Sequence, residues 1–180
     1  MSLLGIRVLG DPILRQETTP VTEFTADLQR LIDDMFETMR AAKGVGLAAP
    51  QVGRSERLTV VDANDARHVL INPEIVEREG RIKWEEGCLS IPEIYGDVTR
   101  AARVVVRALD REGNPFEVEG TELFGVCLQH EIDHLHGRLF IDHLSFLKRQ
   151  KALAEWESER VKYPSLIRTI VPGEDDSTEL

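Results

Sequence analysis

The segment 121–135 constrains the fold most, because it combines a nearly continuous apolar helix pattern with two histidines, a glutamate and an aspartate near its end. Few polar positions interrupt the pattern, so we expect a helix that is buried on most sides and is ended by Gly137. Its apolar residues are Leu123, Phe124, Val126, Cys127, Leu128, Ile132 and Leu135. Ionisable groups on such a helix are costly to bury without partners. The rest of the chain is therefore expected to pack around this helix and to supply those partners.

Two further helices are predicted, one before and one after the central helix. Between 28 and 39, apolar residues recur at helical spacing, with Thr25 as a candidate N-cap and Gly44 as a candidate stop. An amphipathic helix with mixed charges on its outer face is predicted over 145–162, and Pro164 stops it. Both patterns are typical of helices that pack one face against a core.

Four segments rich in β-branched residues lie between the first helix and the central one, at 57–63, 68–77, 81–86 and 102–120. The last contains a hairpin turn with its tip at 113–114. Pro92 is expected to end strand pairing after the third segment. Hairpin spacing implies antiparallel pairing rather than βαβ units. The expected fold class is α+β, with antiparallel sheets packed around the central buried helix and with an N-terminal and a C-terminal helix.

The length of 180 residues suits one domain with a hydrophobic core of its own. We expect this single domain to cover 1–165. The last eight residues carry four acidic groups and no basic one. The stretch 166–180 is therefore predicted to be an acidic, flexible tail.

The charge and cysteine content limit the function classes. With 22 basic and 32 acidic residues the net charge is −10, which argues against broad binding to nucleic acid or anionic membranes. No apolar run approaches the roughly 20 residues of a membrane helix, and the N-terminus lacks a signal-peptide pattern. These features predict a cytoplasmic protein in which Cys88 and Cys127 stay reduced. In that setting, a cysteine near histidines is more typical of a ligand or a nucleophile than of a disulfide.

Residues 130–134 read His-Glu-Ile-Asp-His, an HExxH motif on the predicted central helix. Positions four apart lie on one helical face, so His130 and His134 can reach one cation. Divalent metals lower the pKa of bound water, and Glu131 can then accept its proton. HExxH alone also occurs by chance, but the strong helix pattern and the cost of burying these groups without partners favour a metal site.

A catalytic site with one metal needs a third protein ligand and an open position for water. His136 and His143 are poor candidates, because the first points elsewhere on the helix and the second lies past its end. Cys88 is a better candidate, since a thiolate with two imidazoles suits iron(II), zinc, nickel or cobalt. Alternatively, Cys88 is a small buried apolar residue. Cys127 lies one turn before His130 on the same face and is expected to line the site without binding metal.

The run GVGLAAPQ at 44–51 contains small residues that let another backbone approach closely. It lacks the Lys-Ser/Thr pair of a phosphate-binding loop. A tight connection from helix to strand explains Gly44, but it explains the polar Gln51 less well. The side-chain amide of Gln51 is a candidate donor to a developing oxyanion.

Three motifs in this order resemble the peptide deformylase family: GVGLAAPQ at 44–51, EGCLS at 86–90 and QHEIDHLHG at 129–137. The resemblance extends from about residue 5 to about residue 150. It implies a metal-dependent hydrolase that removes the formyl group from N-formylmethionine of new polypeptides and releases formate. It implies that Cys88, His130 and His134 are the metal ligands and that Glu131 is the catalytic glutamate. It also implies that the Gln51 side chain and the Leu89 backbone N–H are the two oxyanion donors.

The resemblance also implies a substrate site. Gly46 would let the peptide lie along the site as an added strand, and Gly87 belongs to the same substrate-binding set. The methionine pocket would be formed by Val45, Leu123, Val126, Cys127 and the His130 ring. Some family members carry an arginine where Tyr95 stands, so the preference beyond methionine stays open.

The implied cofactor is one divalent metal ion, with iron(II) expected natively and with zinc, nickel or cobalt compatible with the same ligands. The implied partners are N-formylmethionyl nascent peptides. Transient contact with the ribosome stays open, because acidic residues dilute the basic ones in the C-terminal helix. No membrane partner and no specific nucleic-acid partner is expected.

Two alternatives remain. An HExxH metallopeptidase would share the ion and Glu131, but it needs neither the cysteine motif nor the glycine-rich run. A non-catalytic module with a structural zinc would need a fourth ligand, either Cys127 or His136. Around the site, we expect an ion pair between Asp133 and Arg100 that braces the central helix against the sheet.

Overall fold

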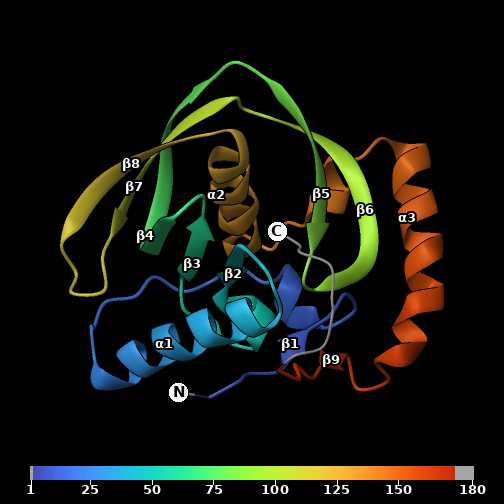
Figure 1. The fold of residues 1–180 in the computed structure, drawn as a ribbon, viewed down its shortest axis with the longest axis horizontal. Coiled ribbons are helices and arrows are strands. Elements are labelled where there is room, and N and C mark those ends of the chain that lie inside the picture. The colour runs from blue at the N-terminus through green and yellow to red at the C-terminus, as the bar shows by residue number, and fades with distance from the viewer. Residues whose placement is uncertain (1, 173–180) are drawn as a thin grey trace.

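The computed structural model describes residues 2–172 (Figure 1). In chain order, the main elements are β1 (Ile6–Arg7), α1 (Ala26–Ala41), β2 (Gly46–Ala48), β3 (Leu58–Ala63), β4 (Ala66–Glu79), β5 (Ile82–Cys88), β6 (Ile91–Arg100), β7 (Arg103–Leu109), β8 (Pro115–Thr121), α2 (Glu122–Leu135), α3 (Phe146–Glu159) and β9 (Ile167–Arg168). Short 3₁₀ helices lie at Pro12–Arg15, Ala49–Val52, Phe140–His143 and Arg160–Lys162. Within the described residues, no helix has both the length and the apolar character needed to span a membrane.

The strands form three sheets. The largest has five strands in the order β2-β3-β4-β7-β8, while β5 pairs with β6 and β1 pairs with β9. Every neighbouring pair of these strands is antiparallel. The predicted α+β class with antiparallel sheets and three helices is confirmed.

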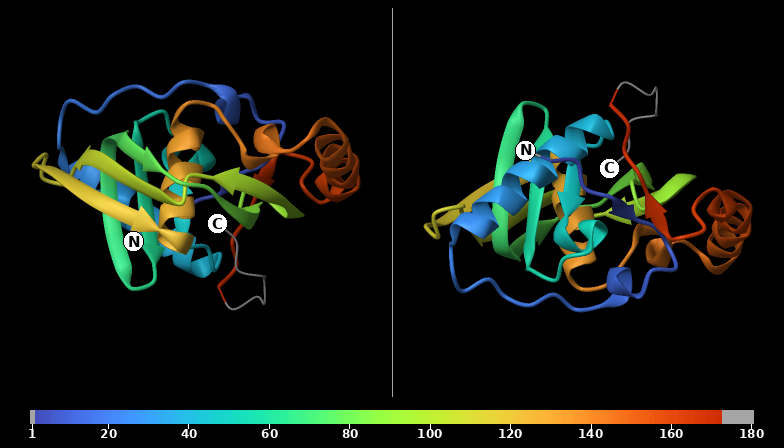
Figure 2. Two further views of the ribbon diagram at one scale, coloured as in Figure 1. Left: turned by 90° about the horizontal axis from the view of Figure 1, so that it is seen from above. Right: turned by 90° about the horizontal axis from the view of Figure 1, so that it is seen from below.

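Helix α2 lies between the five-stranded sheet and the β5–β6 hairpin (Figures 1 and 2). Its residues Val126, Leu128 and Ile132 share an apolar cluster with strands of the large sheet. Two glycines let the helix approach β8 closely, since a Cβ on Gly125 would lie 2.7 Å from the carbonyl oxygen of Gly120. The large sheet and α2 therefore form one tightly packed unit, which limits the movement of side chains on the helix.

The ends of the helices follow local rules that the sequence shows. Helix α1 begins after Thr25, whose side chain accepts a hydrogen bond from the Leu28 N–H. Helix α3 begins after Ser145, whose side chain accepts from the Lys148 N–H. Helix α2 ends shortly before Gly137, whose φ of 71° lies in the left-handed region that favours glycine.

Strand β6 is absent from the sequence prediction, which treats Pro92 as the end of strand pairing. Proline lacks an N–H, so it fits only where the strand ladder needs no donor. The observed register meets this condition. Cys88 pairs with Ile91, the register then shifts, and the next pair joins Glu86 to Gly96. Pro92 lies in the irregular stretch between these two pairs, and the strand continues past it.

The predicted tail begins too early at residue 166. The Val8 N–H donates to the Leu166 carbonyl, and the next two residues form β9, which pairs with β1. Arg168 and Ile170 are buried. Residues 166–170 are therefore part of the folded domain, because they supply both backbone pairing and core side chains. The acidic stretch 173–180 lies outside the described residues.

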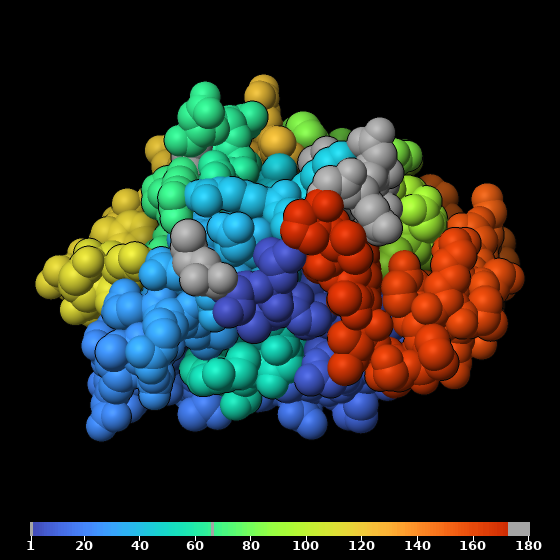
Figure 3. Space-filling model, turned by 60° about the horizontal axis from the view of Figure 1, so that its bottom comes forward, coloured from blue at the N-terminus to red at the C-terminus, as the bar shows by residue number. Residues whose placement is uncertain are grey.

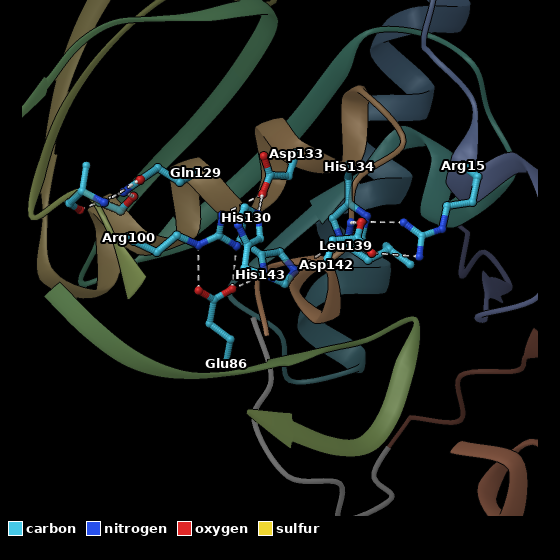
Figure 4. A network of polar contacts seen from close by, with 12 residues as sticks. Arg15, Glu86, Arg100, Gln129, His130, Asp133, His134, Leu139, Asp142 and His143 are labelled. Atoms are coloured by element: carbon cyan, nitrogen blue, oxygen red, sulfur yellow. Dashed lines mark hydrogen bonds and ion pairs between the residues drawn. The ribbon is translucent and has the colours of Figure 1, made fainter. Parts of the chain in front are cut away.

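The guanidinium of Arg100, at the end of β6, lies between two carboxylates (Figure 4). Its Nε and Nη2 donate to Glu86 of β5 at 2.8 Å each, and its Nη1 donates to Asp133 of α2 at 2.6 Å. The predicted pair between Asp133 and Arg100 is confirmed. Burial opposes ionisation of Glu86, but hydrogen bonds from Arg100 and His130 lower its pKa to about 2. Burial also opposes ionisation of Asp133, yet His143 and Arg100 hold its pKa well below the usual range.

Replacing Arg100 with methionine would leave Glu86 and Asp133 buried without their cation. We expect R100M to lower the free energy of unfolding at pH 7 by about 3–5 kcal/mol, the usual cost of breaking a buried ion pair. Both carboxylates have lowered pKa values in the fold. The stability they contribute is therefore present above about pH 4 and is lost as the pH falls. The difference between wild type and R100M, measured by urea unfolding, should shrink as the pH falls toward about 3.

Arg103 offers a matched control, because its guanidinium also contacts carboxylates, those of Glu77, Glu79 and Glu119. Its side chain is 31% exposed, against 4% for Arg100. Exposed ion pairs contribute little, so R103M should destabilise the fold far less than R100M does. Equal losses in the two variants at equal metal content would contradict the role given to the buried network.

Candidate metal centre

Three buried side chains place their ligand atoms around one point. The Sγ of Cys88 lies 3.4 Å from Nε2 of His134, and the Nε2 atoms of His130 and His134 are 3.2 Å apart. One ligand atom from each residue lies within 4.8 Å of the other two. Figure 4 shows both histidines on α2. The structure thus brings together the three residues that the sequence predicts as metal ligands.

The helix and the hairpin place these ligands by simple local rules. His130 and His134 are four residues apart on α2, so both rings leave the same face of the helix. Cys88 is the last residue of β5 and directly precedes the turn at 89–90. A shift in register between Glu86 and Cys88 makes a β-bulge, and the buried Gly87 lies at it. Such bulges re-aim side chains at the end of a strand.

A carboxylate sets the orientation of the His130 ring. The Nδ1 of His130 lies 2.8 Å from Oε1 of Glu86. Because Glu86 is ionised, its oxygen accepts and the His130 Nδ1 donates. The Nε2 then faces Cys88 and His134. Burial opposes a charge on His130, but its contacts with Cys88 and Glu86 raise its pKa well above the usual value. The surroundings of the His130 ring therefore favour a positive charge at this position.

The donor set fits a divalent transition metal. Burial raises the pKa of the Cys88 thiol and lowers that of the His134 imidazole. A thiolate at this position needs a cation beside it, whereas the neutral His134 is already in the form that binds metal. One thiolate and two imidazoles suit iron(II), zinc, nickel or cobalt. Within the described residues the group has three ligands, which leaves a position for water.

Glu131 is buried next to the first histidine without a partner of its own. Its exposed fraction is 0%, and neither carboxylate oxygen has a hydrogen-bond partner among the described residues. Burial raises its pKa to about 7. A carboxylate with a pKa near neutrality can both accept and return a proton. A Cβ on Gly46 would lie 2.7 Å from its Oε1, so a glycine is needed at that position of β2.

The side-chain amide of Gln51 has a fixed orientation. Its Oε1 accepts a hydrogen bond from the Ala48 N–H at 2.9 Å, so its Nε2 faces the other way. The Nε2 donates to Oγ of Ser90 at 3.1 Å and lies 3.6 Å from Sγ of Cys88. Gln51 and the backbone of Leu89 therefore meet at the same turn. Ser90 could not be singled out from local sequence patterns, because its role depends on this contact between distant segments.

Four of the five residues of the predicted methionine pocket, all except His130, share one apolar cluster. Val126 and Cys127 are fully buried, while Val45 and Leu123 are half-buried and pack against the cluster. The Sγ of Cys127 donates to the Val45 carbonyl at 3.7 Å. Leu123, Val126 and Cys127 lie on α2, and Val45 directly precedes β2.

Three other candidate ligands stay outside the group. His136 contacts Glu17 at 2.7 Å on the surface, and His143 contacts Asp133 at 2.8 Å. Neither belongs to the ligand group, nor does Cys127. In the part of the chain that the structure describes, the fourth protein ligand of a closed structural zinc site is missing.

Comparison with known proteins agrees with this geometry. A family model described as polypeptide deformylase matches residues 3–150, a stretch that contains all three sequence motifs. A peptide deformylase of Hydrogenovibrio crunogenus is 51% identical over 162 residues, which cover 88% of this chain and 96% of that protein.

Two crystal structures are similar as well. That of a peptide deformylase from Legionella pneumophila has 48% identity and a TM-score of 0.86, and the match covers 91% of this chain and 99% of that one. That of the peptide deformylase from Thermus thermophilus has 44% identity and a TM-score of 0.84, with 89% and 96% covered. The chain therefore belongs to the polypeptide deformylase family, the metal-dependent hydrolases of N-formyl peptides.

Proposed function

We propose that this chain removes the formyl group from the N-terminal formylmethionine of newly made polypeptides and releases formate. Cys88, His130 and His134 hold the metal ion, and Glu131 moves the proton. The observation that carries this proposal is the convergence of three buried ligand atoms near a buried carboxylate that has no partner of its own. Burying the Glu131 carboxylate without a hydrogen-bond partner costs stability. A role in the reaction explains why the fold tolerates this cost.

A divalent ion held by the three ligands would supply a Lewis acid that polarises the formyl carbonyl and makes water more acidic. Glu131 takes a proton from the attacking water, whose oxygen bonds to the formyl carbon. The former carbonyl oxygen gains negative charge and accepts hydrogen bonds from the Gln51 amide and the Leu89 N–H. Glu131 then gives its proton to the amine nitrogen as the C–N bond breaks. Formate and the free N-terminus leave.

The substrate backbone lies along β2. This strand is at the edge of the five-stranded sheet, where Gly46 pairs with Val61 of β3. Its other edge can accept an extended peptide as an added strand. The methionine side chain then enters the apolar cluster past Val45 and Leu123. Gly87, at the bulge of β5, belongs to the same substrate-binding set on the hairpin side.

Iron(II) is the native ion in this proposal, with zinc, nickel and cobalt as ions that the same ligands accept. The three donors bind all four metals, so availability in the cell selects among them. The enzyme acts on nascent chains in the cytoplasm. Its contact with the ribosome is transient, because acidic residues dilute the basic side chains of α3.

Glu131→Ala removes the proton carrier and leaves the three ligands in place. We expect kcat for formate release to fall by about 10²–10⁴-fold, the usual contribution of a positioned acid–base group. The ion content, measured by atomic spectroscopy, should stay at the wild-type value. Glu155→Ala, on the exposed face of α3, should change neither quantity. Loss of the ion together with the activity of Glu131→Ala would contradict the assigned role.

Metal dependence and the identity of the cleaved bond together test the proposed reaction, because an HExxH peptidase would share the ion but cleave internal bonds. Chelation should abolish formate release from an N-formylmethionyl peptide, and iron(II) or nickel added without oxygen should restore it, since an iron thiolate is oxygen-sensitive. The loaded enzyme should leave the internal bonds of the same peptide intact. Mass spectrometry of the products checks both points. Cleavage of internal bonds, or release that resists chelation, would favour another reaction.

A further inference from the structure

The C-terminal segment 166–171 lies across the outside of the molecule, between the N-terminal segment and α3 (Figure 3). Within it, β9 pairs with β1 in a register that joins Ile6 to Arg168 and Arg7 to Ile167. A Cβ on Gly5 would lie 2.7 Å from Cγ2 of Ile167, so the two segments are in close contact. This packing fixes which side chains of the segment face the interior.

Arg168 points inward from this segment. Arg168 and Ile170 are 6% and 9% exposed, whereas Thr169 between them is exposed, as strand alternation requires. Ile170 belongs to the apolar core around α1. The Nη1 of Arg168 donates to the carbonyl oxygen of Leu89 at 3.2 Å. The segment thus places a buried guanidinium on the backbone of the turn that follows Cys88.

The contacted carbonyl belongs to the central peptide group of that turn. Cys88 pairs with Ile91, so Leu89 and Ser90 are the two turn residues. The orientation of this peptide group is what distinguishes one turn type from another, and it can change while the flanking strands stay paired. Neither Leu89 nor Ser90 has a positive φ. The bond from Arg168 opposes rotation of the peptide group away from this state.

Two further contacts hold the neighbouring residue of the turn. The Leu9 N–H donates to the Ser90 carbonyl at 2.9 Å, and Nε2 of Gln51 donates to the Ser90 Oγ at 3.1 Å. Of these three bonds, the one from Arg168 acts on the Leu89 carbonyl. The Leu89 N–H belongs to the preceding peptide group, which is joined to that carbonyl at the Leu89 Cα, so Arg168 acts on this donor by holding the turn. Because Gln51 is bonded to the same turn, a movement of the turn would displace both of the donors proposed for the oxyanion.

We propose that Arg168 is a positioning residue for the reaction, which holds the turn so that the Leu89 N–H and the Gln51 amide face the developing negative charge. Donors stabilise a transition state most when they are fixed in advance. This inference rests on the proposed oxyanion role of Leu89 and Gln51. Arg168 lies beyond the match to the family model, which ends at residue 150. The C-terminal segment is therefore a part of this chain that supports the site from outside the matched region.

The expected effect on kcat and KM follows from the stage of the reaction at which the oxyanion forms. The oxyanion exists in the transition state and not in the bound substrate, so loosened donors lower kcat more than they raise KM. The ion should stay bound, because Arg168 contacts no ligand atom in the group of Cys88, His130 and His134.

The test compares Arg168→Met, Arg168→Lys and Thr169→Ala in the full chain loaded with zinc. Thr169→Ala is the matched control, because Thr169 is exposed on the same segment. The measurements are kcat and KM for formate release, zinc content, thermal unfolding, and ¹⁵N relaxation dispersion at the Leu89 and Ser90 amides, which reports motion in microseconds to milliseconds.

For Arg168→Met we expect about a tenfold lower kcat, KM within about twofold of wild type, unchanged zinc and new exchange at the two amides. Arg168→Lys, which keeps a donor, should recover part of kcat, and Thr169→Ala should match wild type. Unchanged kcat with a rigid turn would overturn the proposal. So would a joint fall of kcat, zinc content and melting temperature in both Arg168 variants, because that pattern reports a structural role alone.

If Arg168→Met does not fold, Arg168→Gln replaces it and is judged by the same criteria, since its amide is polar but too short to reach the Leu89 carbonyl. If wild type releases no formate with zinc, with iron(II) or with nickel, the proposed function fails and the inferred role in catalysis fails with it. The relaxation data still show in that case whether Arg168 holds the turn. The two failures are therefore distinguishable.

Discussion

The buried guanidinium of Arg100 joins the two parts of the structure that build the site. It neutralises Glu86 on the hairpin and Asp133 on the helix, and Glu86 in turn receives the Nδ1–H of His130. Removing one member would leave an uncompensated buried charge, which costs far more than the intact network contributes. The position of α2 against the hairpin, and with it the meeting of Cys88 and the two histidines, depends on this network.

The two buried glutamates Glu86 and Glu131 have different roles because their surroundings shift their pKa values in opposite directions. Glu86 is surrounded by donors, and its pKa falls to about 2, so it stays ionised and orients a ligand. Glu131 has no hydrogen-bond partner among the described residues, and burial raises its pKa to about 7. Pairs of titratable groups whose environments push their pKa values apart are typical of acid–base sites. The glycine at position 46 leaves the space that the second glutamate occupies.

Local patterns predict much of this structure. The helix ends follow from caps at Thr25 and Ser145, and the i, i+4 spacing in HExxH places two ligands on one face. Contacts between distant segments could not be predicted in this way. The bond from His130 to Glu86 and that from Arg168 to Leu89 exist only once hairpin, helix and C-terminal segment are packed. The tail prediction is wrong for 166–170, because the acidic composition that suggests a tail is confined to the last eight residues. The preceding residues form β9 and bury Arg168 and Ile170.

The most direct test of the central claim is the absorption spectrum of the cobalt(II)-loaded protein, because a thiolate bound to cobalt gives a charge-transfer band in the near ultraviolet. We expect this band in wild type and in Cys127→Ser, and its loss in Cys88→Ser. A band that survives in Cys88→Ser and disappears in Cys127→Ser would show that the other thiol binds the ion. It would contradict the assignment of Cys88, His130 and His134 as the metal ligands.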